Sequence, residues 1–195
     1  MDPLSKFNHF IAYFVPGAVL LVAVLMFLSS IYGKNFLSSM LMVDGFVRVS
    51  ILIIAVTILG VFVDELRHTK IEAYLEQEWA KKKSYDLNKI DDYIAYAPKI
   101  GIEVYKTIVD EYYYFYEFDI NTAICMIVLA CASPIYFSTF QYVGIDSANS
   151  IGILVGVVAC LFGYFGVDCY RYFLDTIIST MEKVENGFRD SIIKK

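Results

Sequence analysis

The chain has 195 residues, of which 58% are hydrophobic and only 19% are charged. A soluble domain of this length usually has about a quarter of its residues charged, and here the apolar residues form four blocks with the charges between them, as expected of a chain whose solvent is lipid. The formal net charge of -5 argues against a nucleic-acid-binding protein, which would carry a basic face.

Transmembrane helices are expected in four apolar segments, residues 10–31, 46–66, 120–140 and 151–167. Each segment approaches the roughly 20 residues needed to cross about 30 Å of hydrocarbon. The expected fold class is therefore all-α, a polytopic membrane protein with four transmembrane helices. Pro16 and Pro134 lie inside the first and third spans, where each removes a helical hydrogen bond and favours a kink.

The segment between the second and third spans, residues 67–119, is too long for a plain connector. The second span is expected to continue into it as a helix, because one helix face would gather Ile71, Tyr74, Leu75 and Trp79. The basic run before Ser84 predicts the end of that helix. Two further short helices are expected, the first ending at Pro98.

Tyrosines are concentrated just before the third span. The four that we assign to an interfacial aromatic belt are Tyr112, Tyr113, Tyr114 and Tyr116. Tyrosine is enriched where a membrane meets water, because its ring is apolar and its hydroxyl is polar.

The tail, residues 168–195, carries an amphipathic pattern. Its apolar residues recur at steps of three and four, at Tyr170, Phe173, Leu174, Ile177, Ile178, Met181, Val184 and Phe188. This spacing predicts a helix that continues out of the fourth span. We expect its apolar face to pack against the middle segment, giving a helical cytoplasmic domain built from the 2–3 loop and the C-terminal helix. A protein partner or the membrane surface is the competing cover.

These segments divide the chain into the first two spans (1–66), a helical insertion (67–119), the last two spans (120–167) and an amphipathic helix (168–195). Placing both termini in the cytoplasm puts fourteen of the sixteen Lys and Arg residues inside, and the reversed arrangement puts two inside. Cytoplasmic loops are the ones that carry excess Lys and Arg, so the first orientation is expected.

The fourth span contains a stripe of small residues with alternating steps of four and three. Its members are Gly152, Gly156, Ala159, Gly163 and Gly166. Small residues let membrane helices approach closely, so the stripe predicts a helix contact. Because four short spans make a thin bundle, we favour a contact between subunits of a homo-oligomer, and a contact within one chain is the alternative.

Chemistry-bearing motifs are sparse. One candidate juxtamembrane cluster is Asp64, His68 and Glu72, which would share a helix face; it could hold a divalent metal or act in acid–base catalysis, and the competing interpretation is a solvated belt of salt bridges. No acidic or basic side chain lies in the middle of a span, which argues against a proton-coupled carrier. We favour the salt-bridge interpretation and therefore expect no catalytic residue, no metal site and no cofactor.

Three groups of residues carry a family resemblance. They are Tyr13-Phe-Val-Pro-Gly17 in the first span, Leu59-Gly60 with Asp64, Arg67 and Glu72 at the exit of the second, and the tyrosine-rich residues 113–118 with Asn121 at the entry of the third. With the four-span layout they resemble small bacterial membrane proteins of phage-defence loci, such as the membrane subunit of the Kiwa system. The resemblance implies a sensor or scaffold in the bacterial inner membrane that recruits a soluble partner, and it implies no catalytic residue.

The function expected from the sequence is thus a non-enzymatic membrane scaffold or sensor. We expect it to be homo-oligomeric, to recruit a cytosolic protein partner and not to bind nucleic acid directly. The alternative is an oligomeric effector pore that depolarises the membrane, since two spans contain proline and the fourth carries the small-residue stripe.

Overall fold

The computed structural model describes the backbone of residues 3–33, 35–36, 39, 42, 44–100 and 102–193, and within these residues all regular secondary structure is helical. Four helices of this described part are long and apolar enough to cross a membrane, which confirms an all-α architecture with four candidate spans. The spans belong to α1 (Pro3–Tyr32), α3 (Gly45–Leu66), α7 (Tyr114–Thr139) and α8 (Ile145–Ile193).

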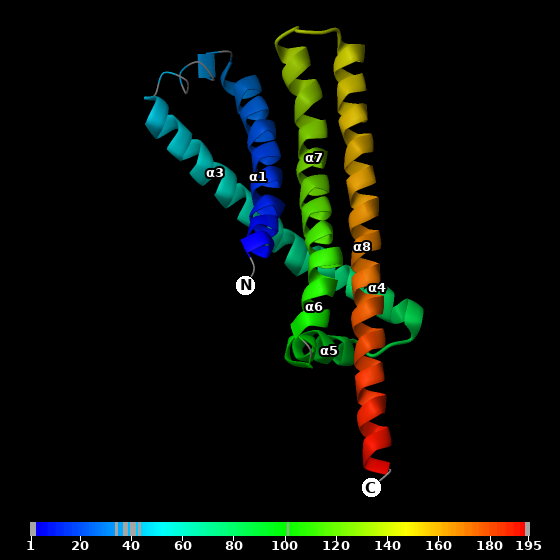
Figure 1. Cartoon of the computed structure of the whole chain (residues 1–195). Helices are drawn as coiled ribbons and strands as arrows, with labels where there is room; N and C mark the ends of the chain where they lie inside the picture. The colour runs from blue at the N-terminus through cyan, green and yellow to red at the C-terminus, as the bar shows by residue number, and fades with distance from the viewer. Residues whose placement is uncertain are drawn as a thin grey trace.

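Helix α7 is central to the bundle, because it packs against both α1 and α8, whereas α3 packs mainly on α1. Figure 1 shows α3 crossing the other spans obliquely, so that its two ends lie on opposite sides of the bundle. The α7–α8 turn and the facing ends of α1 and α3 lie at one end of the bundle. The shorter helices lie at the other end, with the C-terminal half of α8.

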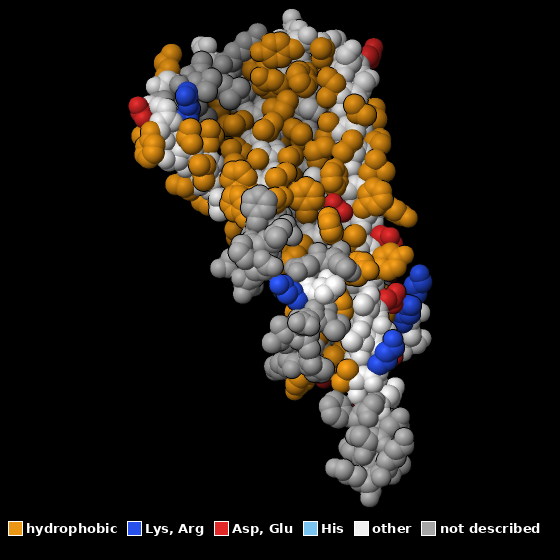
Figure 2. Space-filling model, viewed as in Figure 1, with side chains coloured by type: hydrophobic (Ala, Val, Ile, Leu, Met, Phe, Trp, Pro, Cys, Tyr) orange, Lys and Arg blue, Asp and Glu red, His pale blue; other side chains and the backbone are white. Residues whose placement is uncertain are grey.

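The surface of the bundle is apolar and that of its lower end is charged (Figure 2). Side chains on α3 show this most clearly, since Ile54, Ile58 and Phe62 are 58%, 63% and 65% exposed. A soluble protein rarely exposes such a continuous apolar surface, whereas lipid-facing helices must do so.

Beyond α3 the chain stays helical through residues 67–83 and then folds back. The elements of this region are the π-helical segment η1 (Arg67–Glu72), α4 (Ala73–Lys83), α5 (Leu87–Ile100), α6 (Ile102–Ile108) and a second π-helical segment, η2 (Val109–Tyr113). Helix α4 ends at Ser84, which adopts a left-handed φ of 54°. Helix α5 runs two residues past Pro98, where the sequence predicted its end.

These elements pack against α8 to form what we call the head domain, residues 67–113 and 168–193. The apolar face of α8 supplies the buried residues Tyr170, Phe173, Leu174, Ile177, Ile178 and Met181. The middle segment covers them with Leu75, Trp79, Ile90, Tyr93 and Ile108. The predicted packing of the tail against the middle segment of the same chain is therefore confirmed, while the side chain of Phe188 lies outside the described residues.

Polar contacts fix the register of this packing. The indole Nε1 of Trp79 donates to Asp175 Oδ1 at 3.1 Å. The hydroxyls of Tyr85 and Tyr93 donate to Glu182 and Glu185 at 3.0 and 2.6 Å. Each aromatic ring thus lies against the apolar face of α8 while its polar atom reaches a carboxylate at the edge of that face.

The small-residue stripe of α8 packs against α7 of the same chain. A Cβ atom added to Gly152 would lie 2.9 Å from the Ala130 carbonyl oxygen, and one added to Gly166 would lie 2.7 Å from Ile120 Cγ1. Ala159 is also buried, so the three tight positions recur every seven residues. The contact within one chain, which the sequence left as the alternative, is therefore present at Gly152 and Gly166, and a contact between subunits stays a prediction.

The other two members of the stripe are packed less tightly. A Cβ atom on Gly156 or Gly163 would meet its nearest neighbour at 3.9 or 3.8 Å, which is ordinary van der Waals contact. These positions have room for a side chain, so the stripe is not uniform.

A closer approach, not anticipated from the sequence, joins α1 and α3. A Cβ atom on Gly17 would lie 2.1 Å from the Val56 carbonyl oxygen, and one on Gly60 would lie 2.3 Å from the Tyr13 carbonyl oxygen. Both obstacles are backbone atoms, which cannot move aside as a flexible side chain can. Reciprocal glycines therefore set the distance between the first two spans.

Replacing Gly60 with alanine should destabilise the bundle, and replacing Gly156 with alanine should not. The added methyl group at position 60 meets backbone, and such overpacking costs about 1–3 kcal/mol. The measurement is the fraction of protein that stays monodisperse in size-exclusion chromatography after stepwise heating in detergent. Equal heat resistance of Gly60→Ala and Gly156→Ala would contradict the α1–α3 contact.

Candidate functional site

The most deeply buried charge in the described part of the chain is the guanidinium of Arg67, at the junction of the spans and the head domain. The residue is 1% exposed. Its Nη2 donates to Asp64 Oδ1 at 2.7 Å and to Glu117 Oε1 at 3.1 Å, and its Nη1 donates to Glu72 Oε1. We call Arg67 with these three carboxylates the ion network.

The π-helical segment η1 makes this pairing possible. Residues five apart in an α-helix point about 140° away from one another, since each residue turns the helix by about 100°. The wider π turn brings position i+5 back toward position i, so that Arg67 and Glu72 share a face. A regular α-helix would direct Glu72 away from the guanidinium.

Asn121 connects the ion network to the first span. Pro16 has no backbone N–H, so the carbonyl of Ala12, four residues earlier, loses its helical donor. The Asn121 side-chain nitrogen donates to that carbonyl at 3.2 Å and to Asp64 Oδ1 at 3.1 Å. The proline therefore creates an acceptor for α7 to use, and the network reaches three of the four spans.

Aromatic rings enclose the guanidinium. Its Cζ atom lies 5.1 Å from the centre of the Tyr116 ring and 5.8 Å from that of Tyr113, within the range of cation–π attraction. The Tyr116 ring stacks on Tyr170 with centroids 4.3 Å apart. The Tyr113 hydroxyl donates to Glu72 Oε1 at 3.2 Å. Burial, with the charge of Glu72, raises the pKa of Tyr113, so the hydroxyl stays a donor at neutral pH.

The predicted aromatic belt stays a prediction, but two of its members pack inside the protein. Tyr116 is fully buried and Tyr113 packs on Phe173, where α7 meets the head domain. Tyr112 stacks on Tyr172, and Tyr114 lies beside the cavity described below. A helix entering a packed domain and a helix entering a headgroup layer both favour tyrosine.

The predicted cluster of Asp64, His68 and Glu72 is only partly brought together. His68 Nδ1 contacts Glu72 Oε2, while the His68 side chain is 64% exposed. Asp64 and Glu72 meet through Arg67, which lies between them. Among the described residues no group of three or more His, Cys, Asp or Glu side chains is placed to hold a metal ion. The arrangement is a network of ion pairs, and it is buried, whereas the sequence suggested a solvated belt.

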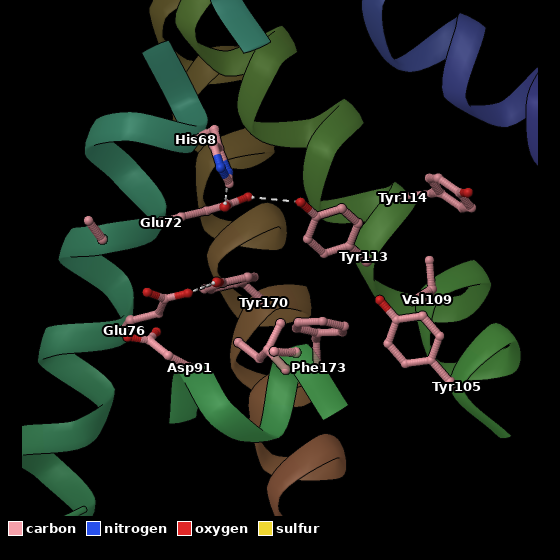
Figure 3. A pocket seen from close by; sticks show the side chains of 13 residues that line it. His68, Glu72, Glu76, Asp91, Tyr105, Val109, Tyr113, Tyr114, Tyr170 and Phe173 are labelled. Carbon is pink, nitrogen blue, oxygen red and sulfur yellow. Dashed lines mark hydrogen bonds and ion pairs between the residues drawn. The ribbon is translucent and has the colours of Figure 1, made fainter. Parts of the chain in front are cut away.

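A cavity of about 580 Å³ opens beside the ion network, within the head domain (Figure 3). Its lining comes from η1, α4, α5, α6, η2, α7 and α8. The lining contains His68, the carboxylates Glu72, Glu76 and Asp91, and the aromatic residues Tyr105, Tyr113, Tyr114, Tyr170 and Phe173. Glu72 and Tyr113 belong both to this cavity and to the surroundings of Arg67.

Comparison of the chain with protein-family models, curated proteins and solved structures found no match. The site is therefore interpreted from its own geometry.

Sequence reasoning missed three members of the site. In the sequence, Arg67 and Asn121 stand only among the residues that carry the family resemblance, and Glu117 lies within the tyrosine-rich residues 113–118. None of the three is assigned a partner there. The one available signal was Asn121 with Glu117 one turn before it, since polar residues near the end of an apolar span must find partners.

Replacing Arg67 with methionine should strongly destabilise the junction. The substitution leaves Glu72 and Glu117 buried without a counter-charge, which typically costs about 3–5 kcal/mol. Arg171→Met is the matched control, because that arginine forms an exposed pair with Glu78 at 3.2 Å, and such pairs contribute about 0–1 kcal/mol. Chemical unfolding in detergent, followed by fluorescence of the single tryptophan, Trp79, gives the comparison. Equal unfolding midpoints for the two variants would contradict the role of Arg67.

Proposed function

We propose that the protein is a non-enzymatic sensor or scaffold of the bacterial inner membrane, with both termini and the head domain in the cytoplasm. The distribution of Lys and Arg supports this orientation. Figure 1 supports the topology, since the N-terminal end of α1 and the head domain lie away from the α7–α8 turn, as an even number of spans requires.

The observation that carries this proposal is the continuity between spans and head domain. Helix α3 passes through η1 into α4 without a break, and α8 is one helix of 49 residues from the α7–α8 turn to the end of the head domain. The ion network joins the two parts where they meet. A change in the packing of the spans would therefore reach the head domain through continuous helices and through the ion network. Removing one member of that network is strongly destabilising, because it leaves a buried charge unpaired.

The head domain offers a surface for a cytosolic partner. Tyr74 on α4 is 65% exposed and Tyr96 on α5 is 53% exposed. Exposed tyrosines are enriched in protein–protein interfaces, where the ring supplies contact area and the hydroxyl a hydrogen bond. The lysines at the end of α4, residues 81–83, add positive charge to the same helix as Tyr74. We propose that the exposed side of α4 and α5 recruits the partner.

We also propose that the protein assembles as a homo-oligomer. The contact is assigned to α3 instead of the α8 stripe, because α8 uses its stripe on α7 and α3 packs mainly on α1 alone. The exposed isoleucines of α3 then face either lipid or a second copy of the chain.

Capture from the native host tests the proposed recruitment. The tagged protein should retain a cytosolic protein, and Tyr74→Arg should reduce capture at least about tenfold, since a charge at the centre of an interface is desolvated on binding. Tyr32→Arg is the matched control, because Tyr32 is also exposed and lies at the C-terminal end of α1, away from the head domain. The resemblance to membrane subunits of phage-defence loci makes infected and uninfected cells the two conditions to compare.

Two results would overturn this function. One is equal capture of every protein by the wild type and Tyr74→Arg. The other is release of ions or dye from liposomes that carry the purified protein, which would favour a membrane-depolarising pore.

A further inference from the structure

The cavity beside the ion network is enclosed by segments far apart in the chain. η1 and α4 form one wall, α5 a second, α6 and η2 a third, and α8 the back (Figure 3). Its volume of about 580 Å³ lies within the range of roughly 300–1,000 Å³ that is typical of small-molecule sites. A concave site lined by this many elements is suited to a small ligand. It is less suited to the flat surface of a partner protein.

The charges around the cavity are unbalanced. Glu72 is paired with Arg67, and its other oxygen contacts Nδ1 of His68, whose side chain also lines the cavity. Glu76 and Asp91 also line it, and among the described residues neither forms a salt bridge. Figure 3 shows these two carboxylates beside one another, and Glu76 lies within electrostatic range of both Glu72 and Asp91. A positive charge in the cavity would relieve this repulsion.

The remaining wall is aromatic. Tyr105, Tyr113, Tyr170 and Phe173 also line the cavity, and Figure 3 shows Tyr105 on the side opposite Glu76 and Asp91. Burial raises the pKa of Tyr105, so that ring stays neutral. The Tyr170 hydroxyl donates to Glu76 Oε1 at 2.6 Å, which holds that carboxylate against the aromatic wall. Ring faces attract cations, and ammonium groups beside several rings are the established example of such recognition.

We propose that this cavity binds a small organic ammonium ion, either a free amine or the headgroup of an ethanolamine phospholipid. The carboxylates of Glu76 and Asp91 would hold the ammonium group, and the aromatic wall would contact its carbon atoms. Anions are disfavoured by the three carboxylates. Among the described residues the carboxylates are not grouped to hold a metal ion, whereas the aromatic rings provide apolar contact for the carbon atoms of an organic cation.

The ammonium ion would be the stimulus that the proposed sensor detects. This regulatory role of the cavity rests on the proposed function. Glu72 accepts from Arg67 and Tyr113, and both Glu72 and Tyr113 line the cavity. An ammonium ion beside Glu72 competes for the same carboxylate and weakens its hold on Arg67. Occupancy of the cavity is thereby linked to the junction between spans and head domain.

Calorimetric titration of the full-length protein in detergent tests the binding. 2-Phenylethylamine, which is cationic at neutral pH, should bind with a Kd on the order of 0.1 mM. Its uncharged analogue 2-phenylethanol should bind at least about tenfold more weakly. Glu76→Gln and Asp91→Asn should each weaken amine binding about tenfold. Glu78→Gln and Asp92→Asn, which make the same change of charge on the same two helices away from this cavity, should leave it unchanged.

A second arm separates the two sources of the ammonium group. Nanodiscs with phosphatidylethanolamine, compared with nanodiscs of phosphatidylcholine and phosphatidylglycerol, should raise the thermal stability of wild-type protein and not that of Glu76→Gln if the ligand is a lipid headgroup. Amine binding without this lipid effect assigns the site to free amines. Absence of both effects overturns the proposal, as does equal weakening by the cavity and control substitutions. Because no partner protein is needed, the site and the proposed recruitment fail or succeed separately.

Discussion

Burial of one guanidinium is the constraint on which the rest of this structure depends. Arg67 lies where apolar spans meet a packed head domain, and a charge removed from water must be paired and hydrogen-bonded. Three carboxylates from two helices meet that demand, and the amide of Asn121 extends the arrangement to the first span. The Arg67 guanidinium needs charge and hydrogen-bond partners on several sides. The π turn in η1, the inward tyrosines and the position of α7 each supply some of them.

The architecture could be predicted from the sequence because lipid imposes a simple rule on composition. Runs of apolar residues long enough to cross hydrocarbon specify helices wherever they occur, so α3 begins and ends within a residue of the expected boundaries. The burial of the apolar face of α8 was also predictable, since an apolar stripe such as Leu174, Ile177 and Met181 must pack against another apolar surface. Both inferences need only periodicity and length.

The candidate site could not be predicted in the same way, because it depends on local departures from periodicity. A π turn shifts every following side chain relative to the α-helical pattern, and the sequence between Arg67 and Glu72 carries no mark of it. The α8 stripe was recognised and its partner was not, because small residues indicate a close approach without naming the helix that approaches. The Gly17–Gly60 contact was missed for the complementary reason: the two glycines lie on different helices, and neither belongs to a repeat of small residues.

Because α8 is long, a small tilt at one point along the helix produces a much larger displacement at its far end. At 1.5 Å per residue, a helix of 49 residues extends for about 73 Å. Its tight contacts with α7 act as a fulcrum near Ala159, roughly 50 Å from the far end of the helix. A tilt of about 5° at that fulcrum would sweep the far end through roughly 4 Å, about the width of a side chain. A rearrangement too small to open a gap between the spans would thus become a displacement about as wide as a side chain at the far end of α8.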